Sequence, residues 1–317
     1  MQYHEIKKAV PHTSETQPQV QEAVSSILEK VRQEGDRAIA YYEKKFDHYE
    51  PETFLVSEEE AVRAKDKLPG DIVDEIDYSI KRATSFSRIQ RDSLVEFEKE
   101  LLPGQIVGQK LIPLESCGCY APGGRYPSIT SAILTIVQAK VAGVKRIIAC
   151  SPPGQTGGID SGVLYAIQKI GVNEIYCFGG AQAICAFAYG TETIRPVDFI
   201  VGPGNQYVNE AKRQVFGTVG IDMLAGPSEC LVIADDTARA DYIAADLVAQ
   251  CEHDPNVRTG LVTTSEELAR KTADEVESQL KDRTTQEVAR RSWEDNGVIA
   301  VVDTLEDAIV FANEYAP

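Results

Sequence analysis

From about residue 105 onward, short runs of apolar and β-branched residues alternate with segments that have the apolar spacing of helices. The strand candidates are Ile106–Ile112, Arg146–Cys150, Glu174–Phe178, Val197–Val201, Cys230–Ala234, Thr259–Thr263 and Val298–Val302. One of the helical segments between them is predicted over Glu266–Arg290. Because parallel strands need a crossover connection, usually a helix, this order predicts an α/β fold with parallel sheets and helices on both faces. Such folds bind ligands at the carboxyl ends of their strands.

The first hundred residues have a different pattern, because their apolar residues recur at helical spacing. Ser57, followed by three glutamates, predicts the start of one of these helices. We therefore expect three parts. Residues 1–104 form a helix-rich part that packs with the first α/β unit, residues 105–228 form a Rossmann-like unit, and residues 229–317 continue the first α/β unit.

Composition narrows the class of protein and its partners. A net charge of −17 argues against nucleic acids and anionic membranes as main partners. The sequence has no run of about 18 apolar residues, so we expect no membrane-spanning helix. Its polar N-terminus lacks the apolar core of a secretory signal. The seven cysteines lie mostly in apolar runs, which indicates reduced, buried thiols in a cytoplasmic protein. Cys117 and Cys119 are too close in sequence for the usual zinc hairpin.

Several loops that follow predicted strands are rich in glycine and proline. They are Tyr120–Gly124, Gly179–Gln182, Gly202–Asn205 and Ala225–Glu229. Small residues let the backbone approach a ligand closely, and two of these loops lead straight into helices, which suits a dinucleotide. None has the Gly-x-Gly-x-x-Gly fingerprint, so each loop taken alone is better explained as a tight turn than as a nucleotide contact. Three such loops at corresponding strand ends of one sheet favour a shared crevice.

Three polar or aromatic residues on these loops have two interpretations each. Gln182 and Asn205 are either N-cap residues or ligand contacts. Tyr120 packs either against a ligand ring or against its own loop. The sequence pattern by itself leaves both alternatives open for each residue.

Gln250 and His253 are three residues apart at the end of a helical segment, so their side chains share one face of a turn. An amide oxygen and an imidazole there form half of a metal site. Alternatively, His253 interacts with the last carbonyls of the helix. The other histidines lie in the first fifty residues and are interpreted as surface or packing residues. Two ligands are fewer than the three that zinc normally takes from a protein.

Seven ordered motifs together resemble the histidinol dehydrogenase family. They are Cys119–Gly124, Ala139–Gly143, Gly179–Ile184, Val201–Asn205, Ala225–Glu229, Ala244–Leu247 and Gln250–Pro255. The resemblance implies two Rossmann-like units and small C-terminal domains. It also implies a zinc-containing homodimer with interlocked subunits, which uses NAD to oxidise L-histidinol through an aldehyde to L-histidine.

The same resemblance implies roles for individual residues. Tyr120, Gln182 and Asn205 match the family's NAD contacts. Ser228, Gln250 and His253 match positions that contact the alcohol substrate. Gln250 and His253 also match two of the zinc ligands.

The chain departs from the family pattern in one respect that concerns catalysis. In the family, the Ala-Pro that matches Ala316-Pro317 is followed by a Glu-His pair that acts as acid and base, and later by an Asp and a His that complete the zinc site. None of these positions is among the 317 residues. We therefore expect a chain that lacks the small C-terminal domains, holds no catalytic residue and is inactive alone. A natural protein that binds nucleotide without catalysis is the alternative.

A second departure concerns the substrate. The loop Gly124–Pro127 resembles that of family members that oxidise sulfonated diols such as 2,3-dihydroxypropane-1-sulfonate. Arg125 either binds the anionic group of such a substrate or lies on the surface. The natural substrate therefore stays open between L-histidinol and a sulfonated diol.

Overall fold

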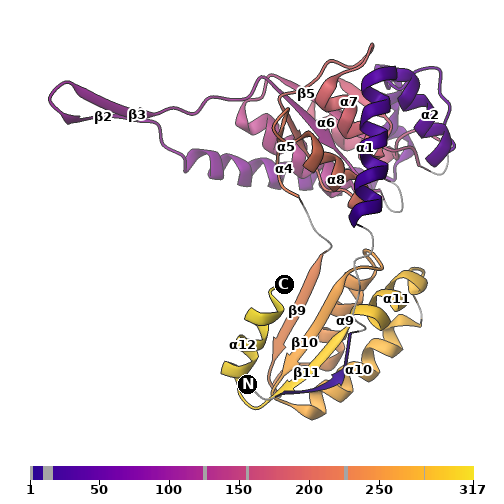
Figure 1. The fold of residues 1–317 in the computed structure, drawn as a ribbon, viewed down its shortest axis with the longest axis vertical. Helices are drawn as coiled ribbons and strands as arrows, with labels where there is room; N and C mark the ends of the chain where they lie inside the picture. The colour runs from indigo at the N-terminus through magenta and orange to yellow at the C-terminus, as the bar shows by residue number, and fades with distance from the viewer. Residues whose placement is uncertain (1–2, 10–16, 124–126, 155–156, 225–227, 282) are drawn as a thin grey trace. The chain divides into compact units, whose positions relative to one another are not determined.

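The computed structural model of the protein describes residues 3–9, 17–123, 127–154, 157–224, 228–281 and 283–317. The chain divides into two compact units (Figure 1). Unit 1 comprises Met1–Glu15 and Gly226–Pro317, and unit 2 comprises Thr16–Ala225. No helix within the described ranges is both long and apolar enough to cross a lipid bilayer.

Unit 2 is built around a five-stranded parallel sheet. Its strands are β4 (Ser116–Tyr120), β5 (Arg146–Ser151), β6 (Glu174–Cys177), β7 (Phe199–Val201) and β8 (Gly220–Ile221). The strand order is β6-β5-β4-β7-β8, and every neighbouring pair is parallel. The predicted α/β class with parallel sheets is confirmed, and β4 lies at the centre of this sheet.

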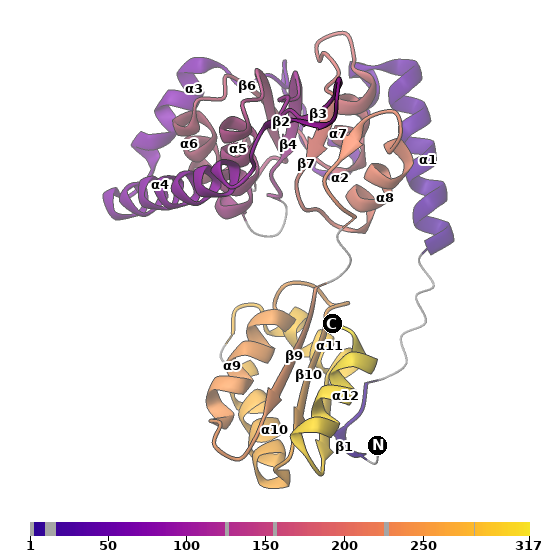
Figure 2. The ribbon, with the colours of Figure 1, turned by 90° about the vertical axis from the view of Figure 1, so that its left-hand side faces the viewer.

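Helices cover both faces of the sheet in unit 2 (Figure 2). One face packs against α1 (Gln17–Glu34), α2 (Asp36–Phe46), α7 (Gly180–Tyr189) and α8 (Gln206–Val215). The other face packs against α3 (Glu58–Arg63), η1 (Ala64–Lys67), α4 (Gly70–Asp92), α5 (Ile129–Ala142) and α6 (Ser161–Ile170). As predicted, Ser57 caps α3, and its side chain accepts a hydrogen bond from the Glu60 N–H.

A two-stranded antiparallel hairpin, β2 (Phe97–Leu102) and β3 (Gln105–Gln109), follows α4 and projects from the rest of unit 2 (Figure 1). Ten of its eleven strand residues are exposed, and Val107 is half-buried. We call residues 97–109 the arm. It lies outside the parallel sheet, because its two strands pair only with each other among the described residues.

Unit 1 has a four-stranded sheet in the order β1-β11-β10-β9. The strands are β1 (Tyr3–Lys7), β9 (Glu229–Ala234), β10 (Arg258–Thr263) and β11 (Val298–Val302). The last three are parallel, whereas β1 is antiparallel to β11. One face packs against α9 (Ala240–Cys251), α10 (Glu266–Leu280) and α11 (Gln286–Asn296), and the other against α12 (Leu305–Tyr315) (Figures 1 and 2).

The structure corrects three expectations about the elements. Ile106–Ile112 is not a strand of the parallel sheet, because β3 of the arm covers its first part. The predicted helix over 266–290 is two helices, α10 and α11, since the chain turns between Leu280 and Gln286. Residues 1–104, taken above as one part, divide between the two units, because β1 pairs with β11 of unit 1.

Candidate functional site

The carboxyl edge of the sheet in unit 2 brings Tyr120 and Gln182 together. Tyr120 is the last residue of β4, and Gln182 lies in the first turn of α7, which begins shortly after β6. Both are buried, with 5% and 1% of their surfaces exposed. The Gly180 N–H donates a hydrogen bond to the Tyr120 hydroxyl oxygen at 3.3 Å, so the start of α7 rests on the end of β4.

Glu43 lies beneath this turn, and sequence reasoning missed it. Its Oε1 accepts hydrogen bonds from the Gly179 N–H at 3.1 Å and from Gln182 Nε2 at 2.9 Å. The side chain is completely buried. Burial raises the pKa of Glu43 to about 7, although these two hydrogen bonds lower it. The signal in the sequence was a carboxylate within the apolar stripe of α2, four residues after buried Ile39.

Asn205 lies at the same edge, at the N-terminus of α8. Its Oδ1 accepts hydrogen bonds from the backbone N–H groups of Tyr207 and Val208, so the N-cap interpretation is confirmed. The preceding turn opens with Gly202, where an added Cβ would lie 2.1 Å from the Tyr120 carbonyl oxygen. The structure therefore places the Gly202–Asn205 turn directly against the end of β4.

Two buried polar atoms at this edge have no hydrogen-bond partner among the described residues. They are Glu43 Oε2 and the hydroxyl oxygen of Ser151, the last residue of β5. Ser151 also faces the Tyr120 loop, since a Cβ on Gly123 would lie 2.8 Å from its Oγ. Buried polar atoms are normally paired, so this edge has unused capacity for a polar ligand. Hydroxyl and amide groups of a dinucleotide fit that capacity.

The other predicted site residues belong to unit 1. Ser228 directly precedes β9, and its carbonyl oxygen accepts a hydrogen bond from the N–H of Arg258, the first residue of β10. Gln250 lies in the last turn of α9 and is half-buried, whereas His253 is exposed in the following turn. Ser228 lies at the amino end of β9, and Gln250 and His253 lie at the end of α9, which runs back from β9 to the start of β10. These residues are therefore toward the amino edge of this sheet, whereas we expected ligand sites at the carboxyl edge.

The donors in unit 1 do not by themselves make a zinc site. The His253 N–H donates to the Gln250 carbonyl oxygen at 3.2 Å, so the two residues are the ends of a single turn, as their spacing predicted. Within the described ranges, no group of three His, Cys, Asp or Glu side chains is arranged to hold a metal. Zinc needs at least three protein ligands, so Gln250 and His253 could supply only part of such a site. Arg125 lies outside the described residues.

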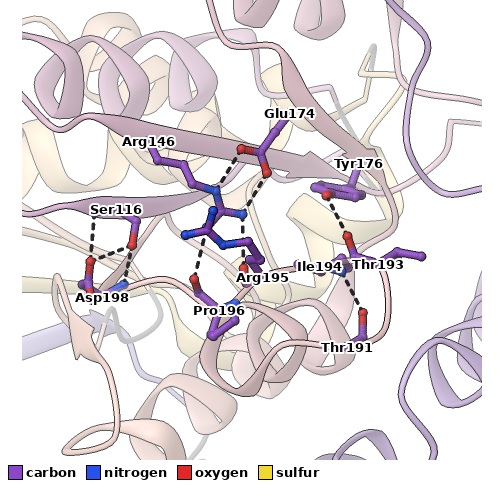
Figure 3. Close-up of polar contacts among 10 residues, drawn as sticks. All are labelled: Ser116, Arg146, Glu174, Tyr176, Thr191, Thr193, Ile194, Arg195, Pro196 and Asp198. Carbon is purple, nitrogen blue, oxygen red and sulfur yellow. Dashed lines mark hydrogen bonds and ion pairs between the residues drawn. The ribbon is translucent and has the colours of Figure 1, made fainter.

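The opposite, amino edge of the sheet in unit 2 is also polar, but its groups satisfy one another (Figure 3). Arg146 forms a two-pronged ion pair with Glu174 and donates to the carbonyl oxygens of Arg195 and Pro196. Asp198 accepts hydrogen bonds from the N–H and hydroxyl of Ser116 at 2.9 and 2.6 Å. This paired edge contrasts with the unpaired atoms at the carboxyl edge.

Comparison with known proteins identifies the family of the chain. The model of the histidinol dehydrogenase family matches residues 10–317. A histidinol dehydrogenase homolog of Shouchella clausii is 43% identical over 99% of this chain and 74% of its own length. The histidinol dehydrogenase of Geobacillus kaustophilus is 46% identical over 93% of the chain and 69% of its own length.

A solved structure agrees with these sequence matches. The crystal structure of histidinol dehydrogenase from Elizabethkingia anophelis is 34% identical and superposes with a TM-score of 0.87, covering 100% of this chain and 75% of the other. Both the sequence and the arrangement of helices and strands therefore match over nearly the whole chain. The chain belongs to the histidinol dehydrogenase family, a family of oxidoreductases.

Proposed function

We propose that this chain carries the NAD site of a dehydrogenase that oxidises L-histidinol through an aldehyde to L-histidine, in histidine biosynthesis. The observation that carries the proposal is the position of Tyr120, Gln182 and Asn205 on adjoining loops at one edge of a parallel sheet. That edge is where folds of this class bind dinucleotides. Family membership supports the reaction, because the relatives are named for histidinol.

We propose a separate part in NAD binding for each of these residues. The N-terminus of α8 follows a turn with two glycines. Its Tyr207 and Val208 N–H groups are used by the Asn205 cap, so we propose that the small turn and the positive end of the helix dipole favour the pyrophosphate. The Oδ1 of Asn205 is used by the helix cap, so we propose that its amide nitrogen is the group that donates to a ligand. The Nε2 of Gln182 is held by Glu43, which leaves its Oε1 as an acceptor for a hydroxyl or amide.

For unit 1 we propose that Gln250 and His253 donate two ligands to zinc and that Ser228 contacts the substrate. Bound zinc would supply a Lewis acid that polarises the alcohol oxygen. Because the described residues hold no complete zinc site, further ligands have to come from another segment or another chain. The family's Glu-His pair after the Ala-Pro is not among these residues, so we expect the 317-residue chain alone to be inactive.

A sulfonated diol is the second substrate candidate. One feature favours it, the sequence of the loop Gly124–Pro127. Arg125 would bind the sulfonate. In either case we propose a cytoplasmic enzyme. All seven cysteines are free thiols, and free thiols are oxidised in compartments where disulfides form.

We also propose that the protein forms a homodimer through the arm. An isolated two-stranded hairpin is marginally stable in water, and this one exposes large apolar side chains. Leu101, Leu102 and Ile106 have 59%, 64% and 69% of their surfaces exposed. Exposed apolar surface of this kind marks a protein interaction site, and its open strand edges are able to pair with those of a second copy.

Calorimetric titration of the chain with NAD tests the site directly. We expect one NAD to bind per chain, and Gln182→Leu to weaken binding by about tenfold, or about 1.4 kcal/mol. Gln279→Leu is the matched control, because Gln279 donates to the Asp241 carbonyl within unit 1, whereas the proposed site is built from residues of unit 2. Absence of binding by the folded wild-type chain would refute the proposal.

Because the 317 residues alone are expected to be inactive, the substrate is tested with a zinc-loaded protein that also contains the family's Glu-His pair. NADH formation is compared with L-histidinol and with 2,3-dihydroxypropane-1-sulfonate as substrates. Faster turnover of L-histidinol supports the first proposal. Faster turnover of the diol, lost on Arg125→Met, would establish the second instead.

A further inference from the structure

A lysine is buried inside unit 2. Lys212 lies on α8, and only 1% of its surface is exposed. Lysine is almost never fully buried unless it is paired, because removing an ammonium from water costs several kcal/mol. The surroundings of Lys212 must therefore offset that cost.

The ammonium of Lys212 has three acceptors, one for each of its N–H groups. It donates to the Gly202 carbonyl oxygen at 3.0 Å and to the Met223 carbonyl oxygen at 2.8 Å. It also forms an ion pair with Asp222. All three N–H donors of Lys212 therefore have acceptors. These acceptors are 10 or 11 residues away in sequence and lie at one location in the fold.

That location is the carboxyl end of two neighbouring strands. Gly202 follows β7, and Asp222 and Met223 follow β8. The second carboxylate oxygen of Asp222 accepts a hydrogen bond from the Gly202 N–H at 2.9 Å. Both polar backbone groups of Gly202 are therefore held, its N–H by Asp222 and its carbonyl by Lys212.

The position of Gly202 is fixed from the opposite side as well. An added Cβ would lie 2.1 Å from the Tyr120 carbonyl oxygen, and the φ of Gly202 is +139°. The backbone of Gly202 thus lies between the end of β4 and the Lys212–Asp222 pair. Three residues later, Asn205 caps α8.

We propose that Lys212 and Asp222 form a clamp that positions the Gly202–Asn205 turn for dinucleotide binding. Lys212 is a positioning residue, because it is buried and acts through Gly202. The inference rests on the proposed NAD site, and it adds to that site two residues that are not ligand contacts. Without the clamp, the turn and the first turn of α8 lose their fixed place at the end of β4.

An ion pair that merely stabilises the fold would behave differently, and the chain contains one for comparison. Arg146, at the amino edge of the same sheet, pairs with Glu174 and donates to two carbonyl oxygens (Figure 3). Lys212 at the carboxyl edge likewise pairs with a carboxylate and donates to two carbonyl oxygens. Arg146→Met is therefore the matched control for Lys212→Met, because each change keeps much of the apolar stem and removes the charge.

Two measurements test the clamp. Amide hydrogen exchange in the absence of ligand is followed at Tyr207 and Val208, whose N–H groups donate to Asn205. Lys212→Met should speed exchange at both amides by tenfold or more relative to the global unfolding of the same variant, whereas Arg146→Met should not. The Kd for NAD should also rise by about tenfold in Lys212→Met and stay within about twofold in Arg146→Met.

The outcomes separate the clamp from the NAD site. If wild type fails to bind NAD, the proposed function fails, and the exchange data alone decide on the clamp. Unchanged exchange at Tyr207 and Val208 in a folded Lys212→Met variant overturns the clamp, as does unchanged NAD affinity in a protein that binds NAD. If Lys212→Met does not fold, Asp222→Asn is measured in the same way, because it removes the charge and keeps an acceptor for the Gly202 N–H. The same criteria then apply.

Discussion

The buried carboxyl of Glu43 makes stability depend on pH in a direction opposite to that of most acidic residues. Its pKa rises from 4.5 in the unfolded chain to about 7 in the folded protein, chiefly because of burial. Between these values the folded state binds more protons than the unfolded state, so stability falls as pH rises. The contribution of Glu43 to the free energy of unfolding is fully present below about pH 4.5 and is lost as pH rises through about 7.

The magnitude follows from the same two values. At about 1.4 kcal/mol for each pH unit, the rise from 4.5 to about 7 corresponds to about 3 kcal/mol. Most of this, about 2.5 kcal/mol, is lost between pH 5 and pH 8. Glu43→Gln removes the titration, while its amide oxygen still accepts hydrogen bonds from Gly179 and Gln182.

Urea unfolding of wild type and Glu43→Gln at pH 5, 6, 7 and 8 measures this contribution, since groups common to both proteins cancel in the difference. We expect the difference in free energy of unfolding to change by about 2.5 kcal/mol in favour of the variant as pH rises. Glu50→Gln is the control, because its side chain is 62% exposed, and its curve should run parallel to wild type. A constant difference between Glu43→Gln and wild type would refute the reasoning.

Three further predictions concern the site and the arm. Gly202→Ala should cost about 2–4 kcal/mol in urea unfolding, because its Cβ would lie 2.1 Å from the Tyr120 carbonyl oxygen; a cost below 1 kcal/mol would contradict this packing. Asn205→Ala should lose about 1 kcal/mol of stability, whereas Asn205→Ser should keep the cap but bind NAD about tenfold more weakly. Equal NAD affinity of Asn205→Ser and wild type would exclude a contact from the amide nitrogen. Leu102→Glu with Ile106→Glu should give a monomer by light scattering with unchanged thermal unfolding of the subunit, because both side chains are exposed; a persistent dimer would remove the arm from the interface.

Local patterns predicted those elements whose stabilising contacts are local. The helix after Ser57 was found from sequence because its cap lies within three residues of the groups that it satisfies. The central strand β4 was missed, because Ser116, Cys117 and Gly118 have little intrinsic preference for strands. At Gly118 a Cβ would lie 2.5 Å from the ring of Phe187, so its identity is set by packing against α7, not by strand propensity.

The candidate site divides in the same way. Tyr120, Gln182 and Asn205 lie on glycine loops whose motifs resemble the family, so they were found from sequence. Glu43 was not, since the groups that it holds are 136 and 139 residues further along the chain. Lys212 lies in a helix of ordinary polar composition, and its burial comes from the ends of β7 and β8. The burial and the contacts of Glu43 and Lys212 depend on distant segments that the fold brings together. The sequence around each of them therefore gives only a weak prediction.

Amide hydrogen exchange of the chain with and without saturating NAD tests most directly whether the carboxyl edge of the sheet in unit 2 is the cofactor site. We predict slower exchange with NAD in residues 120–123, 179–184 and 202–208, where the loops after β4, β6 and β7 meet. Residues 146–149 and 174–175, at the amino edge, should be unaffected. Unchanged exchange in all three loops at saturation, or protection confined to unit 1, would contradict this assignment.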